Sequence, residues 1–272
     1  LAGWEEFRNR RYEKQKALGL IDSSWKLPPF NPKVPKWDSL SDQNKERYDH
    51  MMAIYAAVVS RLDKSIGDLV TGLKKRGVFE NTVILFISDN GGNPEPGAQG
   101  RYEGDNPGDS QSTVFLGQGW AEVGCTPFWA YKHHTHEGGI SSPGIISWPR
   151  GIPKERIGIF ERQPAHITDI LATVADLGGA TYPKSFGGNT IIPTEGTSLT
   201  PLIRGEELQR RQPIFWEHEG NRAVLDGKWK LVSEWEEEWQ LYDIEKDRTE
   251  IHNVIKSQPQ VAAQLIAQYT AW

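Results

Sequence analysis

The sequence lacks several features that would assign it directly to a class of protein, such as secreted disulfide-rich, membrane-spanning or nucleic-acid-binding proteins. Its 272 residues include a single cysteine, Cys125, so an internal disulfide framework is excluded. No apolar run is long enough to cross a bilayer, and no charged-then-apolar signal segment opens the chain. The basic residues form no block that would suggest a nucleic-acid surface, and there is no internal repeat.

What is present is the composition of an ordinary globular protein. Hydrophobic residues make up 37% and charged residues 25%, which argues against disorder. The length suits a large α/β domain, alone or with a smaller one. Because the chain opens at Leu1 and its last helical pattern runs to Trp272 without a stop signal, we interpret it as a fragment of a longer chain.

The first two thirds of the chain predict an α/β domain. After a short helix and a proline-rich connection, apolar residues at helical spacing predict a long amphipathic helix from Ser41-Asp42 to Gly77. The apolar run Thr82–Ser88 predicts a central parallel strand buried on both faces. Gly91–Gly124 predicts a long loop, Pro143–Trp148 a second strand, and His166–Leu177 a second helix.

The C-terminal part predicts a small antiparallel sheet. Asp226-Gly227 is a strong hairpin signal between two short apolar runs. Trp229 and Leu231 alternate with Lys228 and Lys230, so we expect one face of that strand to be buried and the lysine face to be wet.

A further strand at Trp239–Ile244 and a helix from Ser257 complete this part. We therefore expect two regions: residues 1–212 as the later part of a large mixed sheet flanked by helices, and residues 213–272 as an antiparallel-sheet subdomain with one helix.

Asp89 and Asn90 stand directly after the predicted buried strand, followed by two glycines. Ligands of open α/β sheets bind beyond the carboxyl ends of the strands, and these side chains offer hard oxygen ligands to Ca²⁺ or Mg²⁺. The same residues are also common in turns, and spacing alone favours the turn.

A second polar segment, Tyr131–Gly139, contains Lys132 and three histidines. Lys132 offers a point charge for an anionic ester. The histidines His133, His134 and His136 do not match a helical zinc motif, so their pattern favours solvated or hydrogen-bonded side chains over transition-metal ligands.

Taken together, these segments resemble sulfatases of the alkaline phosphatase superfamily over nearly the whole chain. The resemblance rests on "MMAIYAAVVSRLDKSIGDLVTGLKKRGVFENTVILFISDNGG", "PFWAYKHHTHEGGISSPGIISWP" and "WQLYDIEKDRTEIHNV", in this order. It implies an alkaline-phosphatase-like fold and favours the metal interpretation of the first segment over the turn. Asp89 and Asn90 would bind calcium, in preference to magnesium, and Lys132 would be a catalytic, substrate-binding residue near the leaving oxygen. Glu137 would belong to a structural turn.

The resemblance also implies residues that are not found here. Sulfatases of this type carry paired metal-binding aspartates and a Cys-x-Pro-Ser-Arg motif, whose cysteine becomes the formylglycine nucleophile, and we expect both upstream of this chain. Cys125 stands in Cys-Thr-Pro-Phe-Trp, after the metal pair, and we interpret it as an inert loop thiol. The 272-residue chain alone is therefore predicted to be inactive.

Some other polar and aromatic residues have open roles. His218 could reach a substrate, but a hydrogen-bonded structural role is the preferred interpretation. Trp120 and Trp129 could stack on sugars, whereas Trp229 and Trp239 are expected on inward faces of the sheet.

The predicted function is hydrolysis of aryl or carbohydrate sulfate esters by the intact parent protein. The alternatives are a phosphoester or phosphonate ester hydrolase of the same superfamily, and a non-catalytic fragment or pseudoenzyme. The expected partner is a sulfated small molecule or glycan, with no nucleic acid. The resemblance implies a periplasmic or secreted protein, and no sequence pattern sets an oligomeric state.

Overall fold

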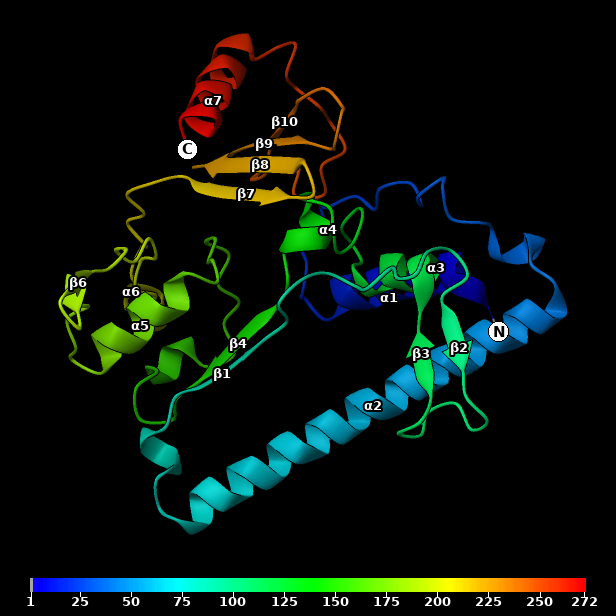
Figure 1. The fold of residues 1–272 in the computed structure, drawn as a ribbon, viewed down its shortest axis with the longest axis horizontal. Coiled ribbons are helices and arrows are strands. Elements are labelled where there is room, and N and C mark those ends of the chain that lie inside the picture. Colours follow the sequence, from blue (N-terminus) through cyan, green and yellow to red (C-terminus); the bar gives the residue numbers. More distant parts are fainter. Residues whose placement is uncertain (1) are drawn as a thin grey trace. The chain divides into compact units, whose positions relative to one another are not determined.

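A computed structural model describes residues 2–272 (Figure 1). The helices in chain order are α1 Gly3–Ala17, α2 Asp42–Lys75, α3 Gly117–Gly124, α4 Glu137–Ile140, α5 Asp169–Leu177, α6 Thr200–Arg204 and α7 Pro259–Ala271. The strands are β1 Ile84–Ile87, β2 Arg101–Glu103, β3 Thr113–Phe115, β4 Gly144–Ser147, β5 Ser185–Phe186, β6 Asn189–Thr190, β7 Ile214–His218, β8 Asn221–Asp226, β9 Trp229–Ser233 and β10 Gln240–Asp243. The chain forms a mixed α/β fold, as predicted.

Two compact units share the chain. The first holds the chain up to Leu69, Asn90–Pro143 and Phe215–Trp272, and the second holds Val70–Asp89 and Gly144–Ile214. The predicted boundary between residues 212 and 213 separates two sequence regions, whereas each compact unit combines segments from several parts of the chain. The predicted boundary therefore stays a prediction.

An aromatic core in the first unit joins α1, the proline-rich connection, α2 and α3. Trp4 packs edge-on against Trp37, with ring centroids 4.9 Å apart, and donates from Nε1 to the Pro35 carbonyl over 3.1 Å. The Trp120 indole likewise donates to the Tyr48 carbonyl over 3.0 Å. The indole N–H groups of Trp4 and Trp120 therefore both have partners, which lets these two large rings fill the core without leaving a buried donor unpaired.

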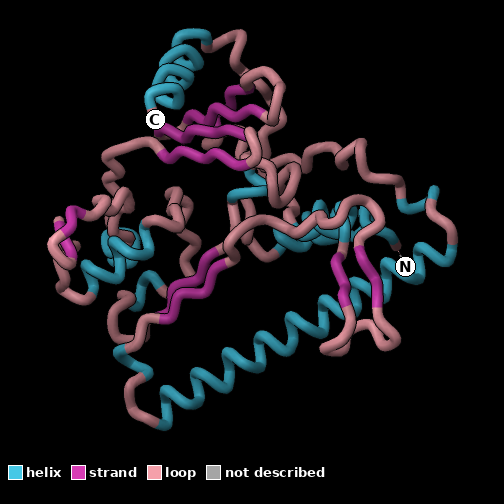
Figure 2. Tube along the Cα trace, in the orientation of Figure 1, coloured by secondary structure: helices cyan, strands magenta, loops and turns pink. Residues whose placement is uncertain are grey.

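The segment Gly91–Gly124 is not the continuous loop predicted from its glycines and polar residues. It contains the antiparallel pair β2–β3 and the helix α3 (Figure 2). Buried Trp120 and half-buried Val114 pack against the aromatic core, so tertiary packing orders a segment whose composition resembles a loop.

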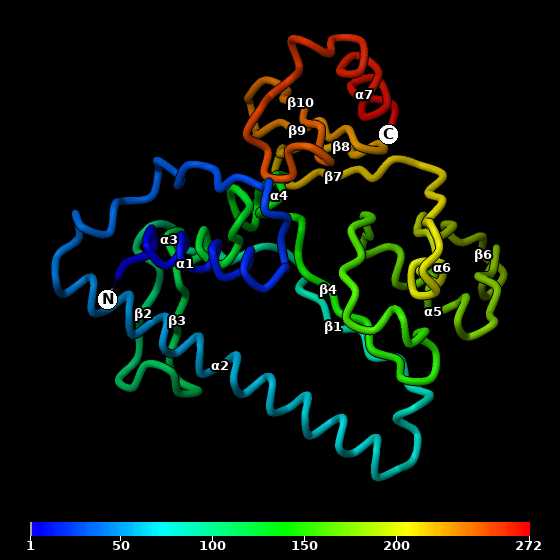
Figure 3. Tube along the Cα trace, turned by 180° about the vertical axis from the view of Figure 1, so that it is seen from behind, coloured from blue at the N-terminus to red at the C-terminus, as the bar shows by residue number. Residues whose placement is uncertain are grey.

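The C-terminal residues form a four-stranded antiparallel sheet in the order β10-β9-β8-β7. The Asp226-Gly227 turn pairs Asp226 with Trp229, which confirms the predicted hairpin. The helix α7 lies against one face of this sheet in both views, and Leu265 packs on Leu231 and its apolar neighbours (Figures 1 and 3). Trp229 and Trp239 pack against the same cluster, as predicted.

The prediction that the lysine face of β9 is wet is wrong for Lys230. Its side chain is fully buried and forms ion pairs of 2.7 Å with both Glu137 and Glu250. Alternation along a strand identifies the two faces, but here the second face is covered by α4 and by the segment after β10. Lys228, by contrast, is 39% exposed and pairs with Asp243.

In the second unit, β1 does not form the predicted parallel, doubly buried strand. It pairs antiparallel with β4, Ile84 opposite Ser147 and Ile87 opposite Gly144. Leu85, Phe86 and Ile87 are 38%, 41% and 39% exposed. The apolar run encodes a strand suited to burial, but it does not encode the direction of its partner or what covers its faces.

The long helix α2 confirms the predicted helix, but its apolar stripe is only partly covered. Met51 is fully buried in the aromatic core, whereas Val58, Leu62 and Leu69 are 58%, 46% and 53% exposed. Helical periodicity therefore fixed the element correctly without fixing the extent of its burial.

Candidate functional site

Two loops of the first unit are held side by side by backbone hydrogen bonds. The Gly91 amide donates to the Gly139 carbonyl over 2.9 Å, and the Lys132 amide donates to the Gly92 carbonyl over 3.1 Å. A Cβ atom at Gly91 would lie 1.9 Å from the Gly138 carbonyl oxygen, so only glycine permits this approach. The structure thus brings together the two segments that the sequence singled out.

Asp89 and Asn90 follow β1 in the order predicted. Asp89 ends the first segment of the second unit and Asn90 opens the adjoining segment of the first unit. The Asn90 amide nitrogen donates to the Gly91 carbonyl over 2.7 Å, which orients the side-chain amide. A carboxylate and an amide oxygen are the hard donors that Ca²⁺ prefers, so the residues present fit the predicted ion. Their role as ligands stays a prediction.

Lys132 places its cation next to an acidic side chain. Its Nζ lies 3.2 Å from Oε1 of Glu95, and His133 Nε2 lies 3.3 Å from the same oxygen. The hydrogen bond from Lys132 holds the pKa of Glu95 below its usual range. The Lys132 side chain is 30% exposed, so its charge is accessible to an anionic ligand. Glu95 gave no signal in the sequence, because it lies 37 residues away within a proline- and glycine-rich stretch.

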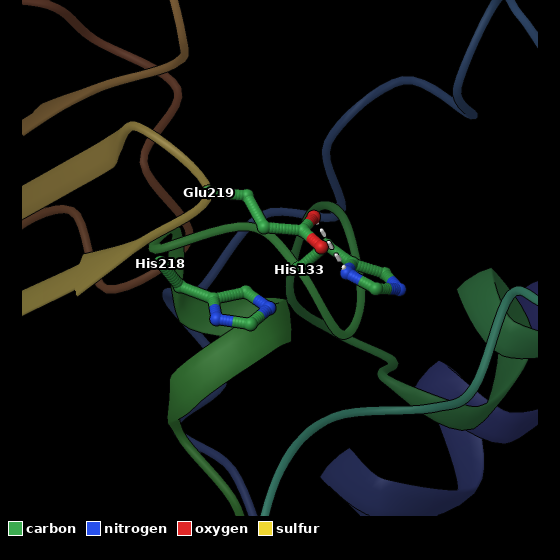
Figure 4. A group of neighbouring side chains, drawn as sticks. All are labelled: His133, His218 and Glu219. Atoms are coloured by element: carbon green, nitrogen blue, oxygen red, sulfur yellow. Dashed lines mark hydrogen bonds and ion pairs between the residues drawn. The ribbon is translucent and has the colours of Figure 1, made fainter.

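The three histidines after Lys132 take different environments. His133 Nδ1 pairs with Oε2 of Glu219 over 3.0 Å, and its ring stacks on that of His218 with centroids 5.5 Å apart (Figure 4). His134 Nδ1 lies 3.1 Å from Oε1 of Glu234, and interaction with His134 lowers the pKa of Glu234.

His136 is buried, and burial lowers the pKa of its ring. Its Nε2 lies 3.4 Å from Oε1 of Gln240, so it resembles the hydrogen-bonded histidine that the sequence favoured.

Glu137, in the same segment as Lys132, is buried and belongs to a charge network. It opens α4, pairs with Lys230 over 2.7 Å and contacts Arg248 Nη1. Arg248 also donates to Ser141 Oγ over 2.7 Å, and the Glu137 amide donates to Glu250 over 2.7 Å. These contacts fit the structural role that the resemblance implies for Glu137.

Cys125 caps the C-terminal end of α3 and is buried. Burial raises the pKa of its thiol to about 11, so it is protonated and unreactive at neutral pH. The Gly92 amide donates to its sulfur over 3.1 Å. The two tryptophans that could have stacked on sugars differ. Trp120 is a core residue, whereas Trp129 packs against His136 with ring centroids 4.6 Å apart.

Comparison with known proteins identifies the class. Residues 8–180 match the sulfatase family model, and residues 127–271 match the model for the C-terminal part of N-sulphoglucosamine sulphohydrolase. The chain belongs to the sulfatase family, in the alkaline phosphatase superfamily.

An uncharacterized sulfatase of Schizosaccharomyces pombe is 29% identical over 290 residues, covering 99% of this chain and 52% of the relative. An arylsulfatase of Klebsiella aerogenes is 30% identical over 226 residues, covering 78% of this chain and 47% of the relative. The chain therefore spans about half the length of these curated relatives.

Among solved structures, that of Ps i-CgsB in complex with k-i-k-neocarrahexaose aligns with a TM-score of 0.61 at 23% identity. The alignment covers 99% of this chain and 54% of that one, and it shows a shared fold. Within residues 2–272, no helix has both the length and the apolar character needed to cross a membrane.

Proposed function

We propose that this chain is the later part of an enzyme that hydrolyses sulfate monoesters of aryl or carbohydrate groups. The observation that supports this most directly is the pair of backbone hydrogen bonds between Gly91 and Gly139 and between Lys132 and Gly92. They hold a cationic side chain beside the segment that begins with the candidate metal ligand Asn90. The relative from Klebsiella aerogenes is named as an arylsulfatase, and its name indicates hydrolysis of aryl sulfate esters.

The chemistry assigned to Lys132 follows from where charge develops. Cleavage of a sulfate ester builds negative charge on the leaving oxygen, and an ammonium group aimed at that oxygen stabilises the charge as it forms. In the ion pair with Glu95, Lys132 Nζ donates to an anionic oxygen over 3.2 Å, which is the contact proposed for the leaving oxygen. In the proposed complex, the leaving oxygen takes the place of the Glu95 carboxylate.

Asp89 and Asn90 would hold a calcium ion with further ligands from outside these two residues, since Ca²⁺ takes six to eight oxygens. When bound, the ion would polarise the sulfate and offset its charge. The nucleophile implied by the resemblance is formylglycine, and this sequence contains no Cys-x-Pro-Ser-Arg motif from which it could form. We therefore propose that the 272-residue chain alone does not turn over sulfate esters.

The test uses the protein expressed from its complete coding sequence and assays 4-nitrophenyl sulfate, 4-nitrophenyl phosphate and a 4-nitrophenyl phosphonate. We expect the sulfate ester to have the highest kcat/KM and Lys132→Ala to lower kcat about 10²–10³-fold, as for loss of one transition-state donor. Lys33→Ala is the matched surface control. Preference for either phosphorus ester would support the alternative hydrolase, and unchanged turnover in Lys132→Ala would remove Lys132 from the site.

A further inference from the structure

The loop after Lys132 brings two histidines to a carboxylate about one hundred residues further along the chain. His134 and His136 lie just before α4, and Glu234 directly follows β9. One ligand atom of each residue lies within 4.8 Å of the others. All three residues belong to the first compact unit, so the cluster is defined within one body.

One side-chain polar atom of each residue in this cluster forms no hydrogen bond within the described part of the chain. His136 is 3% exposed, and its Nδ1 is buried without a hydrogen bond to any part of the chain from residue 2 to 272. The same holds for His134 Nδ1 and Glu234 Oε1, although these two atoms lie only 3.1 Å apart. Buried polar atoms without partners are costly and rare, so the unpartnered His136 Nδ1 beside the His134–Glu234 ion pair indicates a missing ligand.

A hydrogen bond at Nε2 leaves the buried Nδ1 of His136 as the nitrogen that could bind a ligand. Its Nε2 lies 3.4 Å from Oε1 of Gln240, and the Tyr242 hydroxyl donates to the same oxygen over 2.6 Å. Because this oxygen is an acceptor, Nε2 carries the hydrogen and the buried Nδ1 carries the lone pair. Metal-binding histidines are oriented in the same way, by a hydrogen bond from the nitrogen that does not face the metal.

The backbone on both sides of the cluster is held by β8. Thr135 Oγ1 donates to the Arg222 carbonyl over 3.1 Å, and Asn221 Nδ2 donates to the His133 carbonyl over 2.9 Å. The Trp235 amide donates to Asn221 Oδ1 over 3.0 Å. The histidine loop and the carboxylate turn are therefore fixed to the same strand end before any ligand binds.

The spacing between His134 and Glu234 matches that of two ligands of a tetrahedral ion, and His136 offers its ligand atom within 4.8 Å of both. With metal–nitrogen bonds of about 2.0–2.1 Å, two tetrahedral ligand atoms stand roughly 3.3 Å apart. His134 Nδ1 and Glu234 Oε1 are 3.1 Å apart. We propose that His134, His136 and Glu234 bind a transition-metal ion, with zinc as the best match, and leave a fourth position for water. Its effect would be to fasten the loop that carries Lys132 to the antiparallel sheet, and it does not depend on the proposed sulfatase reaction.

The neighbouring cluster of His133, His218 and Glu219 is a weaker candidate. It also has ligand atoms within 4.8 Å of one another, but His218 and Glu219 are exposed. Both ring nitrogens of His133 already face carboxylates, Nδ1 toward Glu219 and Nε2 toward Glu95. This cluster therefore provides the control.

The experiment titrates zinc chloride into the chelator-treated full chain, with millimolar calcium present to occupy sites that prefer oxygen ligands. Calorimetry gives the stoichiometry and Kd, and the visible absorption of the Co²⁺ form reports tetrahedral ligation. We expect one zinc per chain, at least roughly tenfold weaker binding in Glu234→Gln and His134→Ala, and unchanged binding in His133→Ala.

Glu234→Gln keeps the size and polarity of the side chain, so it decides the question if His134→Ala does not fold. Absence of zinc uptake would overturn the site. Binding that survives in Glu234→Gln but is lost in His133→Ala would assign the ion to the other cluster and overturn it equally. A Co²⁺ spectrum of octahedral type would also contradict the proposed ligand set.

Discussion

Replacement of Lys230 by methionine is the sharpest test of whether buried ion pairs stabilise the segment Tyr131–Gly139, which carries Lys132 and Glu137. Lys230 is completely buried between Glu137, which opens α4, and Glu250, which follows β10, with 2.7 Å to each carboxylate. Burial lowers the pKa of Lys230, and Glu250 opposes that shift. Lys230→Met keeps the apolar stem but removes the charge that lies between two carboxylates.

The expected cost follows from the asymmetry of buried ion pairs. Removing one partner leaves uncompensated buried charge and typically destabilises by about 3–5 kcal/mol. Glu137 keeps Arg248 as a second partner, whereas Glu250 loses its ion pair with Lys230, so we expect the lower part of that range. For a chain of this size, about 3 kcal/mol corresponds to a fall in Tm of roughly 6–12 °C. Urea unfolding followed by circular dichroism measures the free energy directly.

Lys228→Met is the matched control, since Lys228 lies two residues away, in the turn directly before β9. Lys228 is 39% exposed and pairs with Asp243 over 3.3 Å, so its loss should cost at most about 1 kcal/mol. The double variant Lys230→Met with Glu250→Gln should recover part of the loss, because it no longer leaves that carboxylate unpaired. If Lys230→Met cost no more than Lys228→Met, the buried network would not have the energetic role assigned here.

Asp89→Ala should weaken calcium retention by more than about tenfold, and equilibrium dialysis with full occupancy would refute the ligand assignment. Glu95→Gln should lower the KM for an anionic ester without changing Tm, because the carboxylate competes for Lys132; a raised KM would contradict this. Burial raises the pKa of Glu122 to about 7 despite Arg8 nearby. The protonated Glu122 therefore stabilises the folded state fully at a pH below 4.5, its pKa in the unfolded chain. As the pH rises through 7, the free energy of unfolding falls by about 3 kcal/mol. Urea titrations at pH 5 and pH 8 should show this fall in the wild type and not in Glu122→Gln, and equal falls would refute it.

The elements that the sequence predicted well are those encoded locally. The helical spacing behind Ser41-Asp42 predicted α2, and Asp226-Gly227 predicted the hairpin between β8 and β9. In both cases, the signal lies within a few residues of the structure it specifies, and no distant partner is needed to interpret it.

The predictions that failed depend on what packs from elsewhere in the chain. Lys230 resembles a wet lysine in its own strand, and it is buried because Glu137 and Glu250 bring opposite charges to it. The run ending at Ile87 resembles a central parallel strand, yet its partner is the antiparallel β4. Alternating patterns and apolar runs show which face of a strand is apolar, whereas the burial of that face and the direction of the neighbouring strand depend on residues far away in the sequence.

The candidate site combines both kinds of information. Gly91 and Gly138 are adjacent to the residues singled out in the sequence. A Cβ at Gly91 would meet the Gly138 carbonyl oxygen, and one at Gly138 would meet the carbonyl oxygens of Trp129 and Ala130, which explains why glycine stands at both positions. The histidines after Lys132 were visible as a group, but spacing could not pair His134 and His136 with Glu234, because the carboxylate comes from the end of β9. The metal site proposed for these residues combines one loop with one distant strand end, so the spacing of the histidines by itself carries no signal for it.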